Sequence, residues 1–418
     1  MRLYHGRRGG ETSYSEGLKD RTKEVMAAIE EKDIPGSDFL GWRRLPEEGL
    51  DGIEELLERS ESFRKDLDVL LILGIGGSFL GAKAVYEALA PKFSPIEGCP
   101  EVLFLGCDLS SEILEETLDY LEGKSFGVNV ISKSGKTLET AAAFAFVEEL
   151  LRRRYPESWK ERLVVTTDPE KGALRPFAQE EGLLTYPVAE DVGGRYSVLS
   201  PVGLFPLAVA GIDVKALLEG ARDAKEDMKR QGVDSDAARY AMDRTIQREA
   251  GKSIEILATY DPKAVGLGAW YAQLFGESEG KEGKGLFPTS LLFTRDLHSM
   301  GQWIQEGPRT IFETLLLFTE EPKTMIPKES LGLGVEALRH RAMEEMNRAA
   351  IEGTMDAHEA GDVPNFVWEL PKKDAYHLGV WLYSMEEACA ISAILLGVNP
   401  FNQPGVEEYK SRMLENLR

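Results

Sequence analysis

Residues 126–138 read Phe-Gly-Val-Asn-Val-Ile-Ser-Lys-Ser-Gly-Lys-Thr-Leu. The first six positions are mostly apolar and β-favouring, which predicts a buried strand, and residues 138–153 then carry apolar side chains at helical spacing. Between them, residues 132–137 bring together three hydroxyls, two ammonium groups and a glycine. Amides at the start of a helix bind anions, so this turn predicts a phosphate site. The alternative is a solvated helix start, in which Ser134 or Thr137 only satisfies free amides.

The end of this turn, Gly135-Lys136-Thr137, also matches the end of a triphosphate-binding loop. That loop needs a glycine five positions before Gly135, where this chain has Val130 inside the predicted strand. Binding of a nucleoside triphosphate is therefore not expected, and a monophosphate fits the turn better.

The alternation of apolar runs and helical segments extends over residues 68–180, which is typical of strands that alternate with helices. The predicted strands are residues 69–73, 102–105, 128–131 and 163–167. The predicted helices are residues 79–90, 111–121, 138–153 and 171–180. Because the runs are hydrophobic throughout, both faces of a parallel sheet should be covered, so this part predicts a doubly wound α/β domain.

After Gly193-Gly194 the sequence becomes helical and a second α/β unit follows. The predicted helices are residues 198–210, 214–229, 236–250, 264–275, 334–352, 374–396 and 405–417, and the predicted strands are residues 253–259, 289–293 and 310–318. We therefore expect a first domain at residues 1–190, a second at 191–396, and a turn and helix at 397–418.

Composition narrows the class of protein. The 418 residues include 71 acidic and 49 basic side chains, for a formal charge of -22, which argues against binding to nucleic acid or anionic membranes. Cys99, Cys107 and Cys389 show no disulfide or metal spacing, which suits a reducing compartment. With no apolar signal segment at the start and no apolar run long enough to span a membrane, a cytoplasmic protein is expected.

A glycine cluster at residues 73–81, Leu-Gly-Ile-Gly-Gly-Ser-Phe-Leu-Gly, follows the first predicted strand. The amides of Gly76 and Gly77 could face an anion there, and Ser78 favours that over a simple tight turn. A dinucleotide fingerprint would need Gly or Ala where Phe79 stands, and an acidic residue nearer than Asp108.

Three further side chains stand at junctions. Arg195 follows paired glycines at the predicted domain boundary, where it could stabilise developing negative charge, although a surface arginine is usually solvated. Glu277 ends a helix with aromatic residues, and taken alone it would be read as a solvated carboxylate. His298 precedes another helical segment. The five histidines show no ligand spacing, so no metal site is expected.

Residues 399–410 form a predicted rigid turn and helix, Asn-Pro-Phe-Asn-Gln-Pro-Gly-Val-Glu-Glu-Tyr-Lys. Proline at the first helical position fixes the direction of entry. Lys410 lies two turns further, where it could point back towards the turn, although a solvated helical lysine is the ordinary interpretation.

Taken together, these motifs resemble the glucose-6-phosphate isomerase family in its compact bacterial form. The motifs are Gly-Ile-Gly-Gly-Ser, Ser-Lys-Ser-Gly-Lys-Thr, Val-Gly-Gly-Arg-Tyr-Ser, Glu-Ser-Glu-Gly-Lys and Phe-Asn-Gln-Pro-Gly-Val-Glu-Glu-Tyr-Lys, in that order over residues 70–412. The resemblance implies two α/β/α sandwich domains of the sugar-isomerase kind with parallel-rich sheets, a C-terminal segment that packs back, and a homodimer with its active site at the domain and subunit junction.

The resemblance also implies roles for matching residues. Glu277 would be the catalytic base, Arg195 would stabilise the intermediate, and His298 with Lys410 would open the sugar ring. The substrate and its phosphate would be held by Gly76, Gly77, Ser78, Ser132, Lys133, Ser134, Thr137 and Gln403. Three positions depart from the usual family residue: Lys136 replaces threonine, Glu279 replaces asparagine and Asn402 replaces aspartate.

The expected reaction is the interconversion of glucose 6-phosphate and fructose 6-phosphate in glycolysis and gluconeogenesis. One carboxylate can move a proton between C1 and C2 through a cis-enediolate, so no cofactor or metal is required. A non-catalytic sugar-phosphate sensor is the alternative, but such a protein need not keep Glu277, His298 and Lys410. Isomerisation of an aminosugar phosphate would call for an amidotransferase domain or ammonia chemistry, which the sequence does not indicate.

Overall fold

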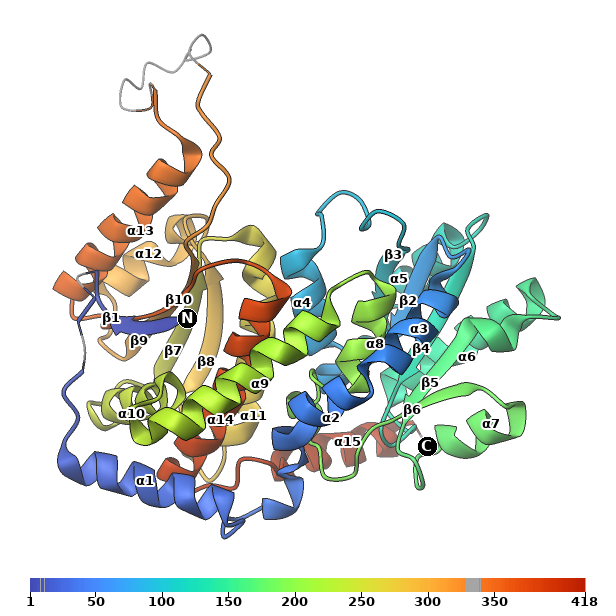
Figure 1. Ribbon diagram of the computed structural model, residues 1–418, viewed down its shortest axis with the longest axis horizontal. Helices are drawn as coiled ribbons and strands as arrows, with labels where there is room; N and C mark the ends of the chain where they lie inside the picture. Colours follow the sequence, from blue (N-terminus) through green and yellow to red (C-terminus); the bar gives the residue numbers. More distant parts are fainter. Residues whose placement is uncertain (8, 11, 328–337, 339, 418) are drawn as a thin grey trace.

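The described part of the chain forms two five-stranded sheets, each covered by helices (Figure 1). The computed structural model describes residues 1–7, 9–10, 12–327, 338 and 340–417. The two sheets lie side by side along the long axis of the molecule, and helix α15 (Pro404–Asn416) lies below the junction between them in this view.

The first sheet is parallel, with the strand order β3-β2-β4-β5-β6. Its strands are β2 (Val69–Leu73), β3 (Glu101–Leu105), β4 (Phe126–Ile131), β5 (Leu163–Thr167) and β6 (Leu184–Pro187). The four predicted strands are confirmed, and β6 was missed. The winding direction reverses between β2 and β4, so the turns that follow these two strands meet at the switch point, where open α/β sheets bind ligands.

Helices cover both faces of the first sheet, as its continuous hydrophobicity predicts. They are α3 (Ile53–Arg64), α4 (Leu80–Leu89), α5 (Ser111–Tyr120), α6 (Leu138–Arg154), α7 (Leu174–Glu181) and α8 (Pro201–Val209). Every residue of β2, β4 and β5 is buried, which confirms the doubly wound arrangement.

The second sheet has the order β1-β10-β9-β7-β8 and is parallel except for its edge strand β1. Its strands are β1 (Arg2–His5), β7 (Ile254–Thr259), β8 (Phe287–Leu292), β9 (Ile311–Phe318) and β10 (Asn365–Leu370). Strands β1 and β10 were missed. A first domain of residues 1–190 would place residues 2–5 with the first sheet. Instead, β1 pairs with β10, so these residues belong to the second sheet. The predicted division near residue 190 otherwise stays a prediction.

The helices around the second sheet include the longest in the protein. They are α1 (Glu16–Glu30), α2 (Leu45–Asp51), α9 (Val214–Gln231), α10 (Asp236–Glu249), α11 (Val265–Glu279), α12 (Leu297–Glu306), α13 (Met343–Ala360) and α14 (Ala375–Leu396). The helix predicted at residues 334–352 begins at Met343 instead, and residues 334–337 and 339 lie outside the described part.

Helix α14 is the core helix of this half. It is long and apolar enough to cross a membrane by length and composition, but 89% of its most apolar window is buried inside the protein. Glycines let it touch α9 backbone to backbone: a Cβ on Gly379 would lie 1.9 Å from the carbonyl oxygen of Leu217, and one on Gly220 would lie 1.9 Å from that of Tyr376. This close packing fixes the wall on which the end of α11 rests.

Candidate active site

A cleft of about 510 Å³ lies where the two halves meet. The turns after β2 and β4, the Gly194-Arg195 turn, the end of α11 and helix α15 line it. Of the predicted site residues, the cleft contains Gly76, Gly77, Ser134, Thr137, Arg195, Glu277, Gln403 and Lys410. Residues from five separate parts of the sequence therefore meet in one place.

Two glycines shape the turn after β2 at the cleft. A Cβ on Gly77 would lie 2.1 Å from the carbonyl carbon and oxygen of Gly194, so any side chain at position 77 would push the two turns apart. Gly76 has a positive φ of 58°, which favours glycine. The glycine turn therefore lies directly against the segment that carries Arg195.

Hydrogen bonds among its own residues shape the predicted phosphate turn. Ser132 is buried, and its Oγ accepts from the amide of Gly135 at 3.1 Å. Ser134 Oγ accepts from the amide of Lys136 at 3.2 Å, while Thr137 is the N-cap residue of α6 and its side chain makes no capping bond. The solvated helix start would use the hydroxyl of Ser134 or Thr137 to satisfy free amides. Of these two, only the Ser134 hydroxyl accepts from a backbone amide here. The Thr137 hydroxyl lies 3.5 Å from Ser132 Oγ, and the first amides of α6 remain to face an anion.

Three residues predicted at the phosphate site do not line the cleft: the buried Ser132, Lys133 and Ser78. The ammonium group of Lys133 donates to the carbonyl oxygens of Glu190 at 2.8 Å and Val192 at 3.2 Å, and burial lowers its pKa. Ser78 ends the short turn of residues 76–78, where its amide donates to Ile75 O at 3.2 Å. Lys133 thus ties the phosphate turn to the segment before Arg195.

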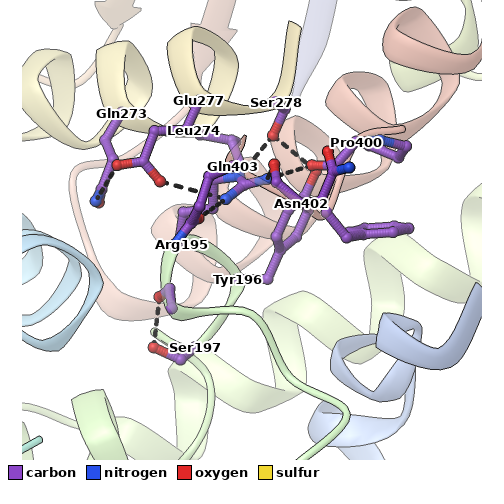
Figure 2. A network of polar contacts seen from close by, with 12 residues as sticks. Arg195, Tyr196, Ser197, Gln273, Leu274, Glu277, Ser278, Pro400, Asn402 and Gln403 are labelled. Atoms are coloured by element: carbon purple, nitrogen blue, oxygen red, sulfur yellow. Dashed lines mark hydrogen bonds and ion pairs between the residues drawn. The ribbon is translucent and has the colours of Figure 1, made fainter. Parts of the chain in front are cut away.

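Arg195 is the centre of the polar network in Figure 2. It is only 3% exposed, and its Nε donates to Ser278 Oγ at 2.7 Å. Its Nη1 donates to Glu277 Oε2 at 3.2 Å and to Gln403 Oε1 at 2.8 Å. Its Nη2 donates to the backbone carbonyl oxygens of Pro400 and Asn402. A guanidinium group that meets five acceptors in fixed directions is strongly oriented.

The Glu277 carboxylate lies at the cleft end of α11 with 34% of its side chain exposed. One oxygen accepts from Arg195, and the other accepts from Nε2 of Gln273 at 3.3 Å. Gln273 also lines the cleft, and its own Oε1 is buried without a hydrogen-bond partner among the described residues. Sequence reasoning missed Gln273, although its position one helical turn before Glu277 was a usable signal.

The end of α11 is anchored in the core by a buried ion cluster. Arg244 on α10 donates to Glu279 at 2.7 Å and to Glu255 on β7, and all three side chains are at most 2% exposed. Burial raises the pKa of Glu279. Glu279, one of the departures from the family pattern, therefore pairs in the core and leaves the cleft to Glu277.

The C-terminal helix supplies the last wall of the cleft. Lys410 is exposed, lines the cleft and lies 3.5 Å from Glu407 one turn earlier. Gln403, directly before α15, reaches Arg195. The predicted turn and helix at the C-terminus thus pack back over the site.

His298 is not brought to Glu277 within one chain. It is exposed in the first turn of α12 and does not line the cleft. In Figure 1, α12 lies beside α13, well apart from α15. Within the described part of the chain, no group of three or more His, Cys, Asp or Glu side chains is placed to hold a metal ion.

Comparison with known proteins gives consistent matches. A family model described as phosphoglucose isomerase matches residues 58–285. A glucose-6-phosphate isomerase from Staphylococcus saprophyticus is 45% identical over 405 residues, which cover 96% of this chain and 91% of that protein.

Solved structures match over the same length. A hypothetical protein from Thermus thermophilus has a TM-score of 0.86 and 31% identity, covering 96% of this chain and 94% of that one. A glucose-6-phosphate isomerase from Chlamydia trachomatis has a TM-score of 0.81 and 19% identity, covering 97% and 87%. The second match confirms the fold that the sequence predicted.

Proposed function

Because the chain belongs to the phosphoglucose isomerase family, we propose that the cleft around Glu277 and Arg195 is where it isomerises its substrate. The protein interconverts glucose 6-phosphate and fructose 6-phosphate, a step of glycolysis. What remains to be assigned is the part that each residue plays.

Glu277 is the base that moves the proton between C1 and C2. The observation that carries this role is the contact of Glu277 with Arg195, because it places a carboxylate and a fixed cation on the same cleft wall. A carboxylate that reaches both carbons from one face can remove the proton from one and return it to the other. Arg195 stabilises the negative charge of the cis-enediolate, because the guanidinium is already oriented before that charge develops.

The turns after β4 and β2 bind the phosphate end of the sugar. Ser134, Thr137, Gly76 and Gly77 line the cleft, and the amides at the start of α6 add positive potential. Ser132 and Lys133 act indirectly, by shaping the turn and tying it to residues 190–192. This anchor orients the sugar so that C1 and C2 meet Glu277.

Ring opening requires a proton to leave the C1 hydroxyl and another to reach the ring oxygen. Lys410 in the cleft and His298 share this task. Because His298 lies apart from the cleft within one chain, we infer that it comes from a second copy, so the active form is a homodimer with shared sites.

Mixed dimers test the shared site. Glu277→Gln and His298→Ala homodimers should each be inactive, but a mixed dimer should pair intact Glu277 of one subunit with His298 of the partner subunit at one of its two sites. After random mixing, about a quarter of wild-type activity should return. No recovery, despite mass spectrometry showing mixed dimers, would place His298 outside the partner's site.

The proton transfer needs neither a cofactor nor a metal, because one carboxylate and one guanidinium supply the required charges. Activity with fructose 6-phosphate should therefore be unchanged by a metal chelator, and a loss of activity would contradict this mechanism. A cytoplasmic location is proposed because three cysteines remain free among the described residues and the net charge is strongly negative.

A further inference from the structure

Lys281 lies two residues after the end of α11 and joins two parts of the site without lining the cleft. Its half-buried ammonium group donates to the carbonyl oxygen of Ser278 at 3.0 Å and to that of Asn399. Ser278 lies next to Glu277 in the chain, and Asn399 begins the turn that leads into α15. The Lys281 side chain thus connects the end of α11, where Glu277 lies, to the C-terminal segment.

The turn at residues 399–403 is held mainly through its backbone. Asn399 O accepts from Lys281, while Pro400 O and Asn402 O accept from Arg195. Phe401 is the apolar anchor: it is 5% exposed and its ring centroid lies 5.3 Å from that of Tyr196.

Helix α15 has few attachments of its own. Its described side chains are exposed except for Val406 and Met413, which are half-buried. The ion pairs of Lys410 and Arg412 are made to Glu407 and Glu408 within the helix. The position of Lys410 in the cleft therefore depends on how the preceding turn is held.

We propose that Lys281 is a positioning residue, whose link between Ser278 and Asn399 sets the placement of Gln403 and Lys410 relative to Glu277. The proposal rests on the roles assigned above to Glu277 and Lys410. Arg195 cannot replace Lys281 in this task, because its donors are already engaged by the side chains of Glu277, Ser278 and Gln403 and by two other carbonyls of the turn, those of Pro400 and Asn402. Asn399 O is therefore left to Lys281.

The charged groups around Lys281 make the link sensitive to pH. Burial and then the charge of Arg195 lower the pKa of Lys281 to about 8, while Glu277, Glu279 and Cys389 oppose that shift. Above this pH the ammonium loses its charge, and its hydrogen bonds to the two carbonyls weaken. An arginine at position 281 would keep its charge throughout this range.

The test compares Lys281→Met, Lys281→Arg and a matched control, Lys284→Met. Lys284 also donates to a backbone carbonyl, that of Gly397 at 3.3 Å, but Gly397 lies outside the turn of residues 399–403. Hydrogen exchange over residues 399–410 and steady-state turnover of fructose 6-phosphate are measured on the full-length protein.

Lys281→Met should speed exchange over residues 399–410 by about tenfold while exchange in β7 stays unchanged. It should lower kcat by about tenfold or more, because a small displacement of Lys410 and Gln403 degrades the reacting geometry. Lys281→Arg should restore most of both quantities, and Lys284→Met should alter neither. Wild-type exchange and wild-type kcat in Lys281→Met would overturn the proposal.

Two further measurements separate a failure of the Lys281 link from a folding defect and from a failure of the proposed base. If Lys281→Met does not fold, raising the pH from 7 to 9 should loosen residues 399–410 in the wild type but not in Lys281→Arg, after correction for intrinsic exchange. Equal pH responses would then overturn the link. Full turnover in Glu277→Gln would instead overturn the proposed base, whatever the exchange data show for Lys281.

Discussion

Nη1 of Arg195 lies 3.2 Å from Oε2 of Glu277, with the guanidinium buried beneath a carboxylate that is one third exposed. The arginine therefore does two things at once. It orients the carboxylate from below, and it brings fixed positive charge to the place where an enediolate would form. Because the same guanidinium holds Gln403 and the turn before α15, the base and the C-terminal wall of the cleft share one support.

Replacement of Glu277 by glutamine should remove the base while keeping the shape of the side chain. We expect kcat to fall by about 10³-fold or more, because general base catalysis is lost, while substrate binding survives. A coupled assay from fructose 6-phosphate measures the turnover. The control Glu282→Gln changes an exposed carboxylate beyond the end of α11 and should leave kcat unchanged. Near-normal turnover in Glu277→Gln would show that the base is another group.

Replacement of Ser134 by alanine should mainly raise KM. Ser134 is in the phosphate turn, far from the carbons that react, so its contacts stabilise substrate and transition state to similar degrees. We expect KM to rise by about tenfold with little change in kcat. Ser110→Ala is a matched control at the N-cap of α5, where Ser110 Oγ accepts from the amide of Ile113. It should cost about 1 kcal/mol of stability without changing KM. Equal losses in kcat and KM would contradict an anchoring role for Ser134.

Lys136 is exposed in the cleft lining. We expect Lys136→Thr to raise KM several-fold at low ionic strength, because one positive charge near the phosphate is lost. The difference from wild type should shrink towards about 0.5 M salt, since screening weakens exposed charges. Lys92→Thr removes an exposed lysine outside the cleft lining and should leave KM unaltered at every salt concentration. A KM difference that persists at high salt would assign Lys136 a role other than charge.

Glu386 on α14 should make stability depend on pH. Both carboxyl oxygens are buried without hydrogen-bond partners among the described residues, and burial, followed by the charge of Glu387, raises the pKa of Glu386 well above its usual 4.5. The folded state then holds this proton more tightly than the unfolded chain, so stability falls as pH rises above about 4.5 towards the folded pKa.

Glu386→Gln removes the titration and should raise Tm at pH 7, with the gain narrowing towards pH 4. Over the range between the two pKa values, the difference in unfolding free energy should grow by about 1.4 kcal/mol per pH unit. Glu226→Gln, at an exposed position on α9, should show no such trend. A Tm difference that is constant from pH 4 to pH 8 would mean that Glu386 does not bind its proton more tightly in the folded state.

The sequence predicted elements well where the physical signal is local. Residues 69–73 and 163–167 were placed correctly because a fully buried parallel strand is hydrophobic along its whole length. Strand β10 was missed because Asn365 and Glu369 interrupt its apolar pattern, and β1 because it has four residues and its partner lies at the far end of the chain.

The site residues likewise fall into those that a local sequence signal identifies and those that it does not. Arg195, Glu277 and Gln403 stand in motifs at the ends of elements, where chemistry is recognisable from residue type. Gln273 lies within a helix and Lys281 binds only carbonyls, so residue type alone did not assign a role to either, although Gln273 stands one turn before Glu277 and Lys281 ends the Glu-Ser-Glu-Gly-Lys motif. The distance of His298 from the cleft is a property of tertiary structure that no local pattern contains.

The pairing of β1 with β10 has a consequence for how the protein is made. Arg2 is made well before its partner Glu369, which follows about 370 residues later in the chain. At about 5 to 20 residues per second, the first strand waits on the order of 20 to 70 seconds before its place in the second sheet exists. Within that interval all strands of the first sheet are made and this sheet can fold, while the second sheet still lacks the strand that β1 pairs with. Synthesis therefore orders the assembly of the two halves, and the pairing of β1 with β10 completes the second sheet late.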